Sequence, residues 1–131
     1  MADNKWSEKL PANCPPSDAF EPNNMVFFRL VEAYPPSEVD FLSVKRRSPN
    51  RQHGDECILK ACSVFSSYDS CDVVRKAYRN FRNMLIVKIV LPPHSGVVLQ
   101  TFNDPNHYSW WISKGFNPIE FCQEIQQSGA K

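Results

Sequence analysis

The stretch ILKACSVFSSYDSCDVVRKAYRNFRNMLIVKIVLPPHSGVVLQTF, residues 58–102, decides the fold because regular elements follow one another in it without a break. Its first eight residues, 58–65, form an apolar run of strand length that ends at a polar cluster. That cluster predicts the start of a helix, with Asp69 or Ser70 as the N-cap. Apolar residues then recur at helical spacing as far as Phe81, which predicts an amphipathic helix laid across a sheet.

The second half of this stretch predicts two further strands. Residues 84–91 are almost continuously apolar, as is typical of a strand covered on both faces, and we expect this to be the central strand. Pro92 and Pro93 interrupt the run. The β-branched segment 97–102 then predicts a hairpin partner for the central strand.

A last helix is predicted near the end of the chain. Asn117 is a suitable N-cap, Pro118 occupies the first helical position, and Ser128 and Gly129 end the pattern. Taken together, the elements predict an α+β fold: a mixed β-sheet with a central amphipathic helix and a C-terminal helix packed on it.

The chain of 131 residues has the length of one domain. Residues 1–24 contain four prolines and few periodic apolar positions, so they predict an irregular, proline-rich lead-in. Residues 25–131 would form the single α+β domain, whose first strand is the apolar run 25–31. Trp6 and Phe20 are candidates for fixing the lead-in to that domain.

Targeting signals are absent from the sequence pattern. No segment approaches the roughly 20 apolar residues of a membrane span, and no apolar core follows the N-terminus as it would in a signal peptide. The sequence therefore predicts a cytoplasmic protein without a membrane partner.

Five cysteines at irregular spacing favour free thiols over a disulfide framework. The spacing of His53, Cys57, Cys62 and Cys71 matches no compact zinc site, so no metal is expected and buried structural cysteines are favoured. A thiol nucleophile activated by a histidine, His94 or His107, stays open as a weaker alternative.

Charge is distributed unevenly along the chain. Residues 45–103 carry ten basic and four acidic side chains, whereas residues 1–44 carry three basic and seven acidic ones. The basic middle includes the polar loop 45–56, which has no apolar periodicity and is expected to be mobile. This asymmetry indicates either an anion-attracting face or docking of the acidic N-terminal segment onto the centre.

Arg29 is a lone charge inside the apolar first strand. It is either an arginine at a sheet edge whose head reaches solvent, or an inward-facing ligand for an anion. The pentamer 107–111, HYSWW, is the other unusual segment. Adjacent tryptophans on a strand face opposite sides, so one of them must cover a second layer, line a pocket or meet a partner.

The order of these features resembles that of the ADP-ribosyltransferase superfamily, in particular its small RES-type members. The likeness covers roughly residues 25–102. It consists of an arginine in the first strand, an aromatic-and-serine segment downstream, a strand that runs into serines ahead of a helix, and a polar residue on a later strand. In this chain these features are Arg29, the segment 41–43, the segment 63–67 and Gln100.

The resemblance implies a role for several of these residues. Arg29 would contact a phosphate of NAD, and Ser43 or Ser66 would support the nicotinamide side. Gln100 would stand where the family commonly has an acidic catalytic residue, and this departure weakens any expectation of transferase activity.

The interpretation that best fits the residues is a module that binds an anionic small molecule or a protein partner. The expected ligand-binding residues are Arg29, Ser43, His107, Tyr108, Trp110 and Trp111, with Ser66 and Gln100 as candidate catalytic residues. An NAD-binding enzyme, or its degenerate relative, is the alternative. Nucleic-acid binding through the basic helix is a second alternative, which the near-neutral net charge of +1 disfavours. Its basic residues are Arg75, Lys76, Arg79 and Arg82.

Overall fold

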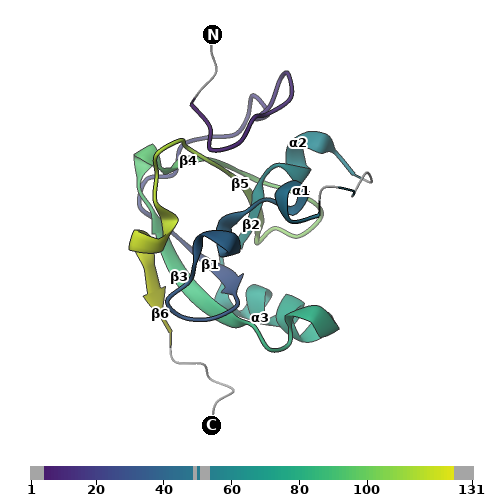
Figure 1. Ribbon diagram of the computed structural model, residues 1–131, viewed down its shortest axis with the longest axis vertical. Coiled ribbons are helices and arrows are strands. Elements are labelled where there is room, and N and C mark those ends of the chain that lie inside the picture. Colours follow the sequence, from purple (N-terminus) through teal and green to yellow (C-terminus); the bar gives the residue numbers. More distant parts are fainter. Residues whose placement is uncertain (1–4, 49, 51–53, 126–131) are drawn as a thin grey trace.

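The computed structural model describes residues 5–48, 50 and 54–125. They form an α+β fold built on a six-stranded sheet with the strand order β4-β5-β2-β1-β3-β6 (Figure 1). All the strand pairs among these residues are antiparallel, so the α+β class is confirmed and the expected mixture of parallel and antiparallel pairs is wrong. The strands are β1 (Met25–Val31), β2 (Cys62–Phe65), β3 (Leu85–Leu91), β4 (Gly96–Gln100), β5 (His107–Ile112) and β6 (Cys122–Glu124).

Short helices complete the fold, and only one of those described reaches ten residues. The α-helices are α1 (Val44–Arg47), α2 (Glu56–Leu59) and α3 (Tyr68–Ala77). The 3-10 helices are η1 (Glu38–Phe41), η2 (Arg79–Phe81), η3 (Pro93–Ser95) and η4 (Pro118–Phe121). Across the described part of the chain, no helix has the length and apolarity needed to cross a membrane.

Helix α3 lies against the sheet face that carries Phe65 and Ile86, as the amphipathic pattern predicted, but it ends at Ala77 and Phe81 belongs to the separate η2. Two apolar residues of the predicted buried stripe, Val73 and Tyr78, are exposed. Its N-cap is Ser67, whose side chain accepts from the backbone N–H of Ser70, so the predicted cap at residue 69 or 70 is wrong by two or three positions. The helix starts early because the Tyr68 ring packs edge-on against Phe28 of β1. This contact draws the first turn onto the sheet.

The apolar run 58–65 is not one strand. Its first residues belong to α2, because the Asp55 carboxylate caps that helix by accepting from the backbone N–H groups of Cys57 and Ile58. The strand that follows, β2, keeps only Cys62–Phe65. A capping aspartate outside the run therefore overrides the strand propensity of its first half.

Strand β3 is an interior strand, as predicted, but β1 and β2 hold the centre of the sheet. Strand β4 pairs with β5 and not with β3, so the predicted hairpin is wrong. The cause lies in the turn: η3 redirects the chain, and Gly96 has φ +134°. A Cβ at Gly96 would lie 2.1 Å from the Trp111 carbonyl oxygen, so only glycine allows β4 to approach β5 this closely.

The predicted C-terminal helix is one turn of 3-10 helix. Asn117 caps it, as expected, by accepting from the N–H of Ile119. The chain then extends as β6 and pairs with β3. Pairing with the exposed edge of β3 satisfies more backbone groups than an isolated short helix would. The predicted end of that helix, at residues 128–129, lies outside the described residues.

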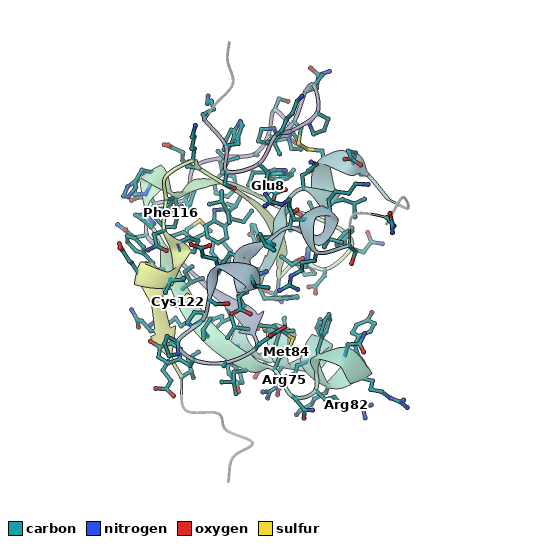
Figure 2. The ribbon with its side chains drawn as sticks, viewed as in Figure 1. Glu8, Arg75, Arg82, Met84, Phe116 and Cys122 are labelled. Atoms are coloured by element: carbon teal, nitrogen blue, oxygen red, sulfur yellow. A yellow bond between two sulfur atoms is a disulfide. The ribbon has the colours of Figure 1, made fainter. Side chains whose placement is uncertain are left out.

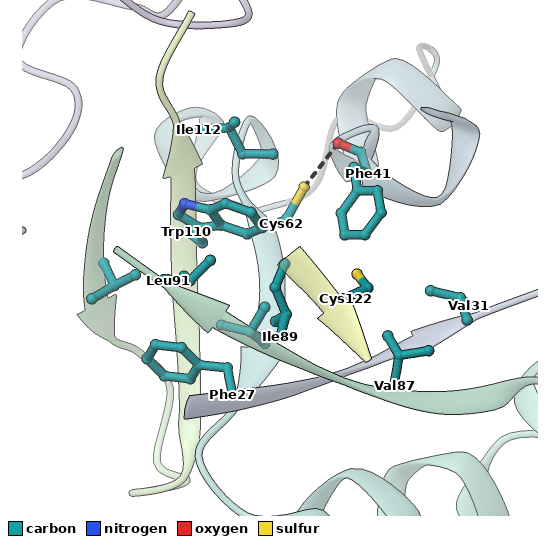
Figure 3. Packing of buried hydrophobic residues seen from close by; sticks show 12 residues of the cluster. Phe27, Val31, Phe41, Cys62, Val87, Ile89, Leu91, Trp110, Ile112 and Cys122 are labelled. Atoms are coloured by element: carbon teal, nitrogen blue, oxygen red, sulfur yellow. Dashed lines mark hydrogen bonds between the residues drawn. The ribbon is translucent and has the colours of Figure 1, made fainter. Parts of the chain in front are cut away.

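The main core lies on the sheet face opposite α3. Phe41 of η1, Trp110 of β5 and Cys122 of β6 are among its members (Figure 3). The adjacent tryptophans do face opposite sides, and both are buried. Trp111 is covered by a second layer, since its indole N–H donates to the Cys57 carbonyl of α2.

The N-terminal segment is held on the body by backbone pairing. Trp6 pairs with Ser113 and Phe20 pairs with Val98. A disulfide joins Cys14 to Cys57, so the expectation of free thiols is wrong for these two cysteines. Disulfides persist mainly in oxidising compartments, and this bond therefore weighs against the cytoplasmic location expected from the sequence.

The polar loop 45–56 is partly helical. Its first residues belong to α1, whose N-cap Ser43 accepts from the N–H of Arg46. Lys45 lies 3.7 Å from the Glu56 carboxylate, which links the two ends of the loop. Residues 49 and 51–53, which include the histidine of the rejected zinc pattern, lie outside the described residues.

Candidate functional site

A cavity of about 340 Å³ opens where β1 and β2 separate. Strand β1 pairs with β3 along all seven of its residues, but it pairs with β2 only at Phe28 and Phe65. The segment from Leu42 to Arg47 borders the cavity on one side, and the end of α3 with η2 borders it on the other (Figure 1). Arg29 and His107 both line it, so the structure brings these two predicted site residues together.

Arg29 spans the gap between the separating strands. Its Nε and Nη2 atoms donate to the Asp40 carbonyl at 2.9 and 2.6 Å, and Nη1 donates to the Ser63 carbonyl. The guanidinium carbon also lies 5.4 Å from the centre of the Phe41 ring. Because Arg29 is 7% exposed and sits on an interior strand, the edge-strand interpretation is wrong.

The charge of Arg29 has no close counter-ion among the described residues. None of their carboxylates lies within 4.0 Å of its nitrogens. The buried Asp40 side chain is used elsewhere, since it accepts from the backbone N–H groups of Glu32 and Ser37. A guanidinium has five N–H groups, and the three hydrogen bonds to the carbonyls of Asp40 and Ser63 leave two for a ligand.

The rest of the cavity wall is mostly apolar. The side chains of Phe65, Phe81 and Met84 are among those that line it. Arg47 adds a second cation at the rim, where its side chain is exposed and donates only a long bond of 3.4 Å to the Val39 carbonyl. The cavity thus combines the buried cation of Arg29, the exposed cation of Arg47 at its rim and an aromatic lining.

His107 is the centre of a chain of hydrogen bonds on the same wall. Its Nε2 lies 3.0 Å from Ser63 Oγ, and its Nδ1 lies 2.9 Å from Thr101 Oγ1. Thr101 Oγ1 lies 3.0 Å from Ser109 Oγ, which closes the chain inside the protein. Phe65 and Phe102 pack on the imidazole, with ring centres 5.2 and 4.8 Å away.

Burial lowers the pKa of His107 below its usual value of 6.5. The Asp104 carboxylate and a hydrogen bond with the Thr101 backbone act in the opposite direction and are the smaller effects. The imidazole is therefore neutral at pH 7 and has one ring nitrogen that can accept a proton.

Ser43, Ser66 and Gln100 do not line this cavity. Ser43 is fully buried and donates to the Glu8 carboxylate at 2.8 Å. Ser66 is exposed and bonds to the Asn106 side chain. The amide of Gln100 donates to the carbonyls of Phe102 and Asp104, so it stabilises the turn between β4 and β5.

The aromatic segment of β5 contributes to packing more than to the cavity. Trp110 donates its indole N–H to the Ser95 carbonyl within the main core. Tyr108 packs edge-on against Phe27 on the same face. Of the pentamer 107–111, only His107 lines the cavity.

The basic face of α3 is largely engaged with the protein itself. Arg75 and Lys76 both pair with Asp72, at 2.6 and 3.1 Å. Arg75 also donates to the Met84 carbonyl, and Figure 2 shows these two residues side by side while Arg82 points outward. This pairing neutralises part of the surface that nucleic-acid binding would require.

The three free cysteines are poor nucleophiles. Burial raises the pKa of Cys62, and it raises the pKa of Cys71 to about 12 and that of Cys122 to about 11. Cys62 lines the cavity but its thiol donates to the Phe41 carbonyl at 3.1 Å. Among the described residues, no hydrogen bond joins either candidate histidine to these thiols: the His94 ring packs on Phe116, and the His107 ring nitrogens lie beside the hydroxyls of Ser63 and Thr101.

Sequence reasoning missed three residues of this site. Ser63 and Thr101 lie within predicted strands, and nothing in their neighbours distinguishes them from ordinary strand residues. Arg47 was placed in a general basic loop. The one signal that Ser63 and Thr101 share is a polar residue at a position where the strand pattern otherwise has apolar ones, and Arg47 has no such signal.

A second hollow, of about 310 Å³, lies near Glu8, Glu38 and Ile112. Its wall carries two carboxylates and one exposed arginine, Arg46, so it lacks the buried cation of the first cavity. Comparison with known proteins adds no relative: the chain matches no protein-family model, no curated protein and no solved structure.

Proposed function

We propose that the chain binds a small anionic molecule in the Arg29 cavity. The observation that carries this proposal is a buried arginine that faces a cavity and has no carboxylate of the described residues within 4.0 Å. An unpaired charge away from water is costly, and a bound anion would compensate it. Two unused N–H groups of one guanidinium match the two oxygens of a carboxylate or phosphate.

The lining adds a preference for the rest of the ligand. Phe65, Phe81 and Met84 offer apolar surface beside the cation. A ligand with an aromatic or apolar body would bury that body on these side chains while its anionic group meets Arg29. We therefore expect aromatic carboxylates or phosphates to bind more tightly than inorganic phosphate.

NAD is one specific candidate among such molecules. The resemblance to ADP-ribosyltransferase-like domains implies that Arg29 contacts a phosphate of NAD. Arg29 lines the cavity, which is consistent with that role. The bonds of Ser66 and Gln100 are made elsewhere, which supports a binding role for this chain over group transfer. NAD thus belongs in the ligand panel as a test of the family resemblance.

Isothermal titration calorimetry of the full chain with phosphate, phenyl phosphate, benzoate, benzamide and NAD tests the proposal. We expect benzoate or phenyl phosphate to bind more tightly than the uncharged benzamide. Arg29→Gln should weaken anion binding by about tenfold or more, because charge-assisted hydrogen bonds contribute roughly 1.5–3 kcal/mol.

Arg82→Gln is the matched control, since it removes an equal charge from an exposed site outside the cavity. It should leave the affinities within about twofold. Equal losses in the two variants would indicate general electrostatic attraction and would contradict a site at Arg29. Absence of heat with every anion at millimolar concentration would also contradict it.

A further inference from the structure

The cavity contains a serine, a histidine and a threonine in hydrogen-bonded sequence. We propose that Ser63 is a nucleophile and His107 its general base, so that the cavity hydrolyses carboxylic esters that carry an anionic group. The choice of an anionic substrate rests on the proposed anion site at Arg29. The reactivity of Ser63 does not, because it depends on the hydroxyl, the imidazole and their access to the cavity alone.

The hydrogen-bond pattern admits one consistent arrangement of protons for this role. The Ser63 hydroxyl donates to Nε2 of His107, and Nδ1–H donates to Thr101 Oγ1. The Thr101 hydroxyl then donates to Ser109 Oγ. In this arrangement Thr101 accepts from the imidazole and the free lone pair of Nε2 faces Ser63, so Thr101 would take the orienting role of the third member in serine-based triads.

Ser63 and His107 are accessible to a substrate although their partners are not. Both line the cavity, Ser63 half-buried and His107 only 7% exposed, whereas Thr101 and Ser109 are buried and do not line it. Ser63 comes from β2 and His107 from β5, and antiparallel pairing of Phe65 with His107 and of Ser63 with Ser109 fixes their spacing. Placement on two paired strands gives a more rigid geometry than placement on loops.

A threonine carries no charge and cannot stabilise the imidazolium that forms when Ser63 gives up its proton. Asp104 supplies the missing charge. Its carboxylate lines the cavity and favours the protonated form of His107. It is held in place by accepting from the N–H of Asn106 at 2.9 Å. The division of orientation and charge between Thr101 and Asp104 replaces a single acidic third member.

The reaction balances with water as the second substrate. Ser63 Oγ forms a bond to the ester carbonyl carbon while its proton moves to Nε2 of His107. The bond between that carbon and the alcohol oxygen breaks, and the alcohol leaves with the proton from Nε2. Water then attacks the acyl group on Ser63, gives a proton to Nε2, and releases the carboxylic acid as the proton returns to Oγ.

A neutral fluorophosphonate is the direct probe, because it reports the reactivity of a serine without requiring the anion site. Ser63 Oγ would displace fluoride from phosphorus and His107 would take the proton. We expect one adduct, located at Ser63 by peptide mass spectrometry. Ser63→Ala should abolish it, and Ser66→Ala, which removes an exposed hydroxyl outside the cavity, should leave it unchanged.

Two variants test the base. His107→Gln should slow labelling by about a hundredfold or more, the range expected for loss of a general base. Asp104→Asn keeps the oxygen that accepts from Asn106 but removes the charge, so it should shift the midpoint of the pH profile for labelling to lower pH. A purely structural role for Asp104 would leave that midpoint in place. Melting curves of each variant show whether it is folded.

The pH profile of the wild-type chain requires no variant. Labelling should fall as the pH decreases through a midpoint below 6.5, where His107 becomes protonated. The other ionisable groups lining the cavity are Arg29, Arg47, Cys62, Tyr78 and Asp104. Asp104→Asn separates the effect of the carboxylate from that of the imidazole.

Labelling at any other residue, an absence of labelling, or a rate that His107→Gln leaves unchanged would overturn the assignment. The outcome is independent of the proposed anion site. If calorimetry shows anion binding at Arg29 while Ser63 stays unlabelled, the chain is a binding module without this activity. If Ser63 is labelled but no anion binds, the activity stands and the anionic substrate is wrong.

Discussion

The two sides of strand β1 differ in how much of the strand they bind. Toward β3, all seven residues of β1 pair, from Met25 opposite Leu91 to Val31 opposite Leu85. Toward β2, one pair forms, Phe28 with Phe65. The closed side is filled by apolar side chains, and the open side holds a buried cation, a histidine and the cavity.

This difference shows how a small sheet can carry a polar site without losing its core. Arg29 follows Phe27 by two residues and so leaves β1 on the same face, but it points into the gap where the strands diverge. Its bonds to Asp40 and Ser63 replace the ladder bonds that the gap lacks. On the open side, side-chain hydrogen bonds of Arg29 join β1 to its neighbours, whereas on the closed side backbone pairing joins β1 to β3.

The largest effect should come from the closed side. Phe27 is completely buried in the main core and pairs with the equally buried Ile89 of β3. Phe27→Ala should lower the free energy of unfolding by about 3–5 kcal/mol, because it removes buried apolar surface and leaves a cavity. Urea unfolding followed by tryptophan fluorescence measures this. If Phe27→Ala lowered the free energy of unfolding by less than about 1 kcal/mol, the idea that the closed side contributes most of the stability would be wrong.

The closed side was also the part that the sequence predicted well. The runs 25–31 and 84–91 gave strands whose observed bounds match to within one residue, because an uninterrupted apolar run of that length has few other structures. The pairing of these strands was not predicted. Residues 32–84 separate them, and no local signal identifies a partner so far away in the chain.

The open side could be predicted only in part. Arg29 was singled out because a charge in an apolar strand is unusual, and His107 because it belongs to the unusual pentamer 107–111; both line the cavity. Ser63 was not singled out, since its role depends on β5 lying beside β2. Gln100 and Ser66 followed from resemblance alone, and their hydrogen bonds lie in turns.

The next largest effect should come from the N-terminal segment and α2, which a disulfide joins. The disulfide between Cys14 and Cys57 closes a sequence separation of 43 residues and fixes the N-terminal segment to α2. Replacing both cysteines by serine should cost about 2–4 kcal/mol. Amide exchange should rise in α2 and β2 and stay low in β3. Equal increases in all three would indicate that the two sides unfold as one unit.

Arg29 tests the open side itself, with an expected loss of about 1–3 kcal/mol for Arg29→Gln, because the carbonyls of Asp40 and Ser63 lose buried donors. Urea unfolding gives this value, and calorimetry on the same variant gives the anion affinity. A variant that keeps its stability yet loses binding would assign Arg29 to the ligand alone. The reverse result would make it a structural brace.

A smaller, pH-dependent effect should come from His107. Burial lowers its pKa, so the unfolded chain binds more protons than the native protein as the pH falls below about 6.5. Stability should decrease in that direction until the native pKa is passed, by at most about 1.4 kcal/mol per pH unit for one proton. Unfolding free energies of the wild type and His107→Gln between pH 7.5 and 5 measure the difference. Parallel curves would contradict the assignment.

The smallest effect should come from a basic residue that belongs to neither side. Arg82 is exposed at the end of η2, where it points outward (Figure 2). Arg82→Ala should change the free energy of unfolding by less than about 0.5 kcal/mol, because an exposed side chain loses little on truncation. The same variant also tests nucleic-acid binding, when fluorescence anisotropy compares its affinity for a labelled single-stranded oligonucleotide with that of the wild type. If binding exists and weakens steeply with salt and with Arg82→Ala, the surface of α3 and η2 is a nucleic-acid site, and the contrast between the two sides of β1 no longer locates the function.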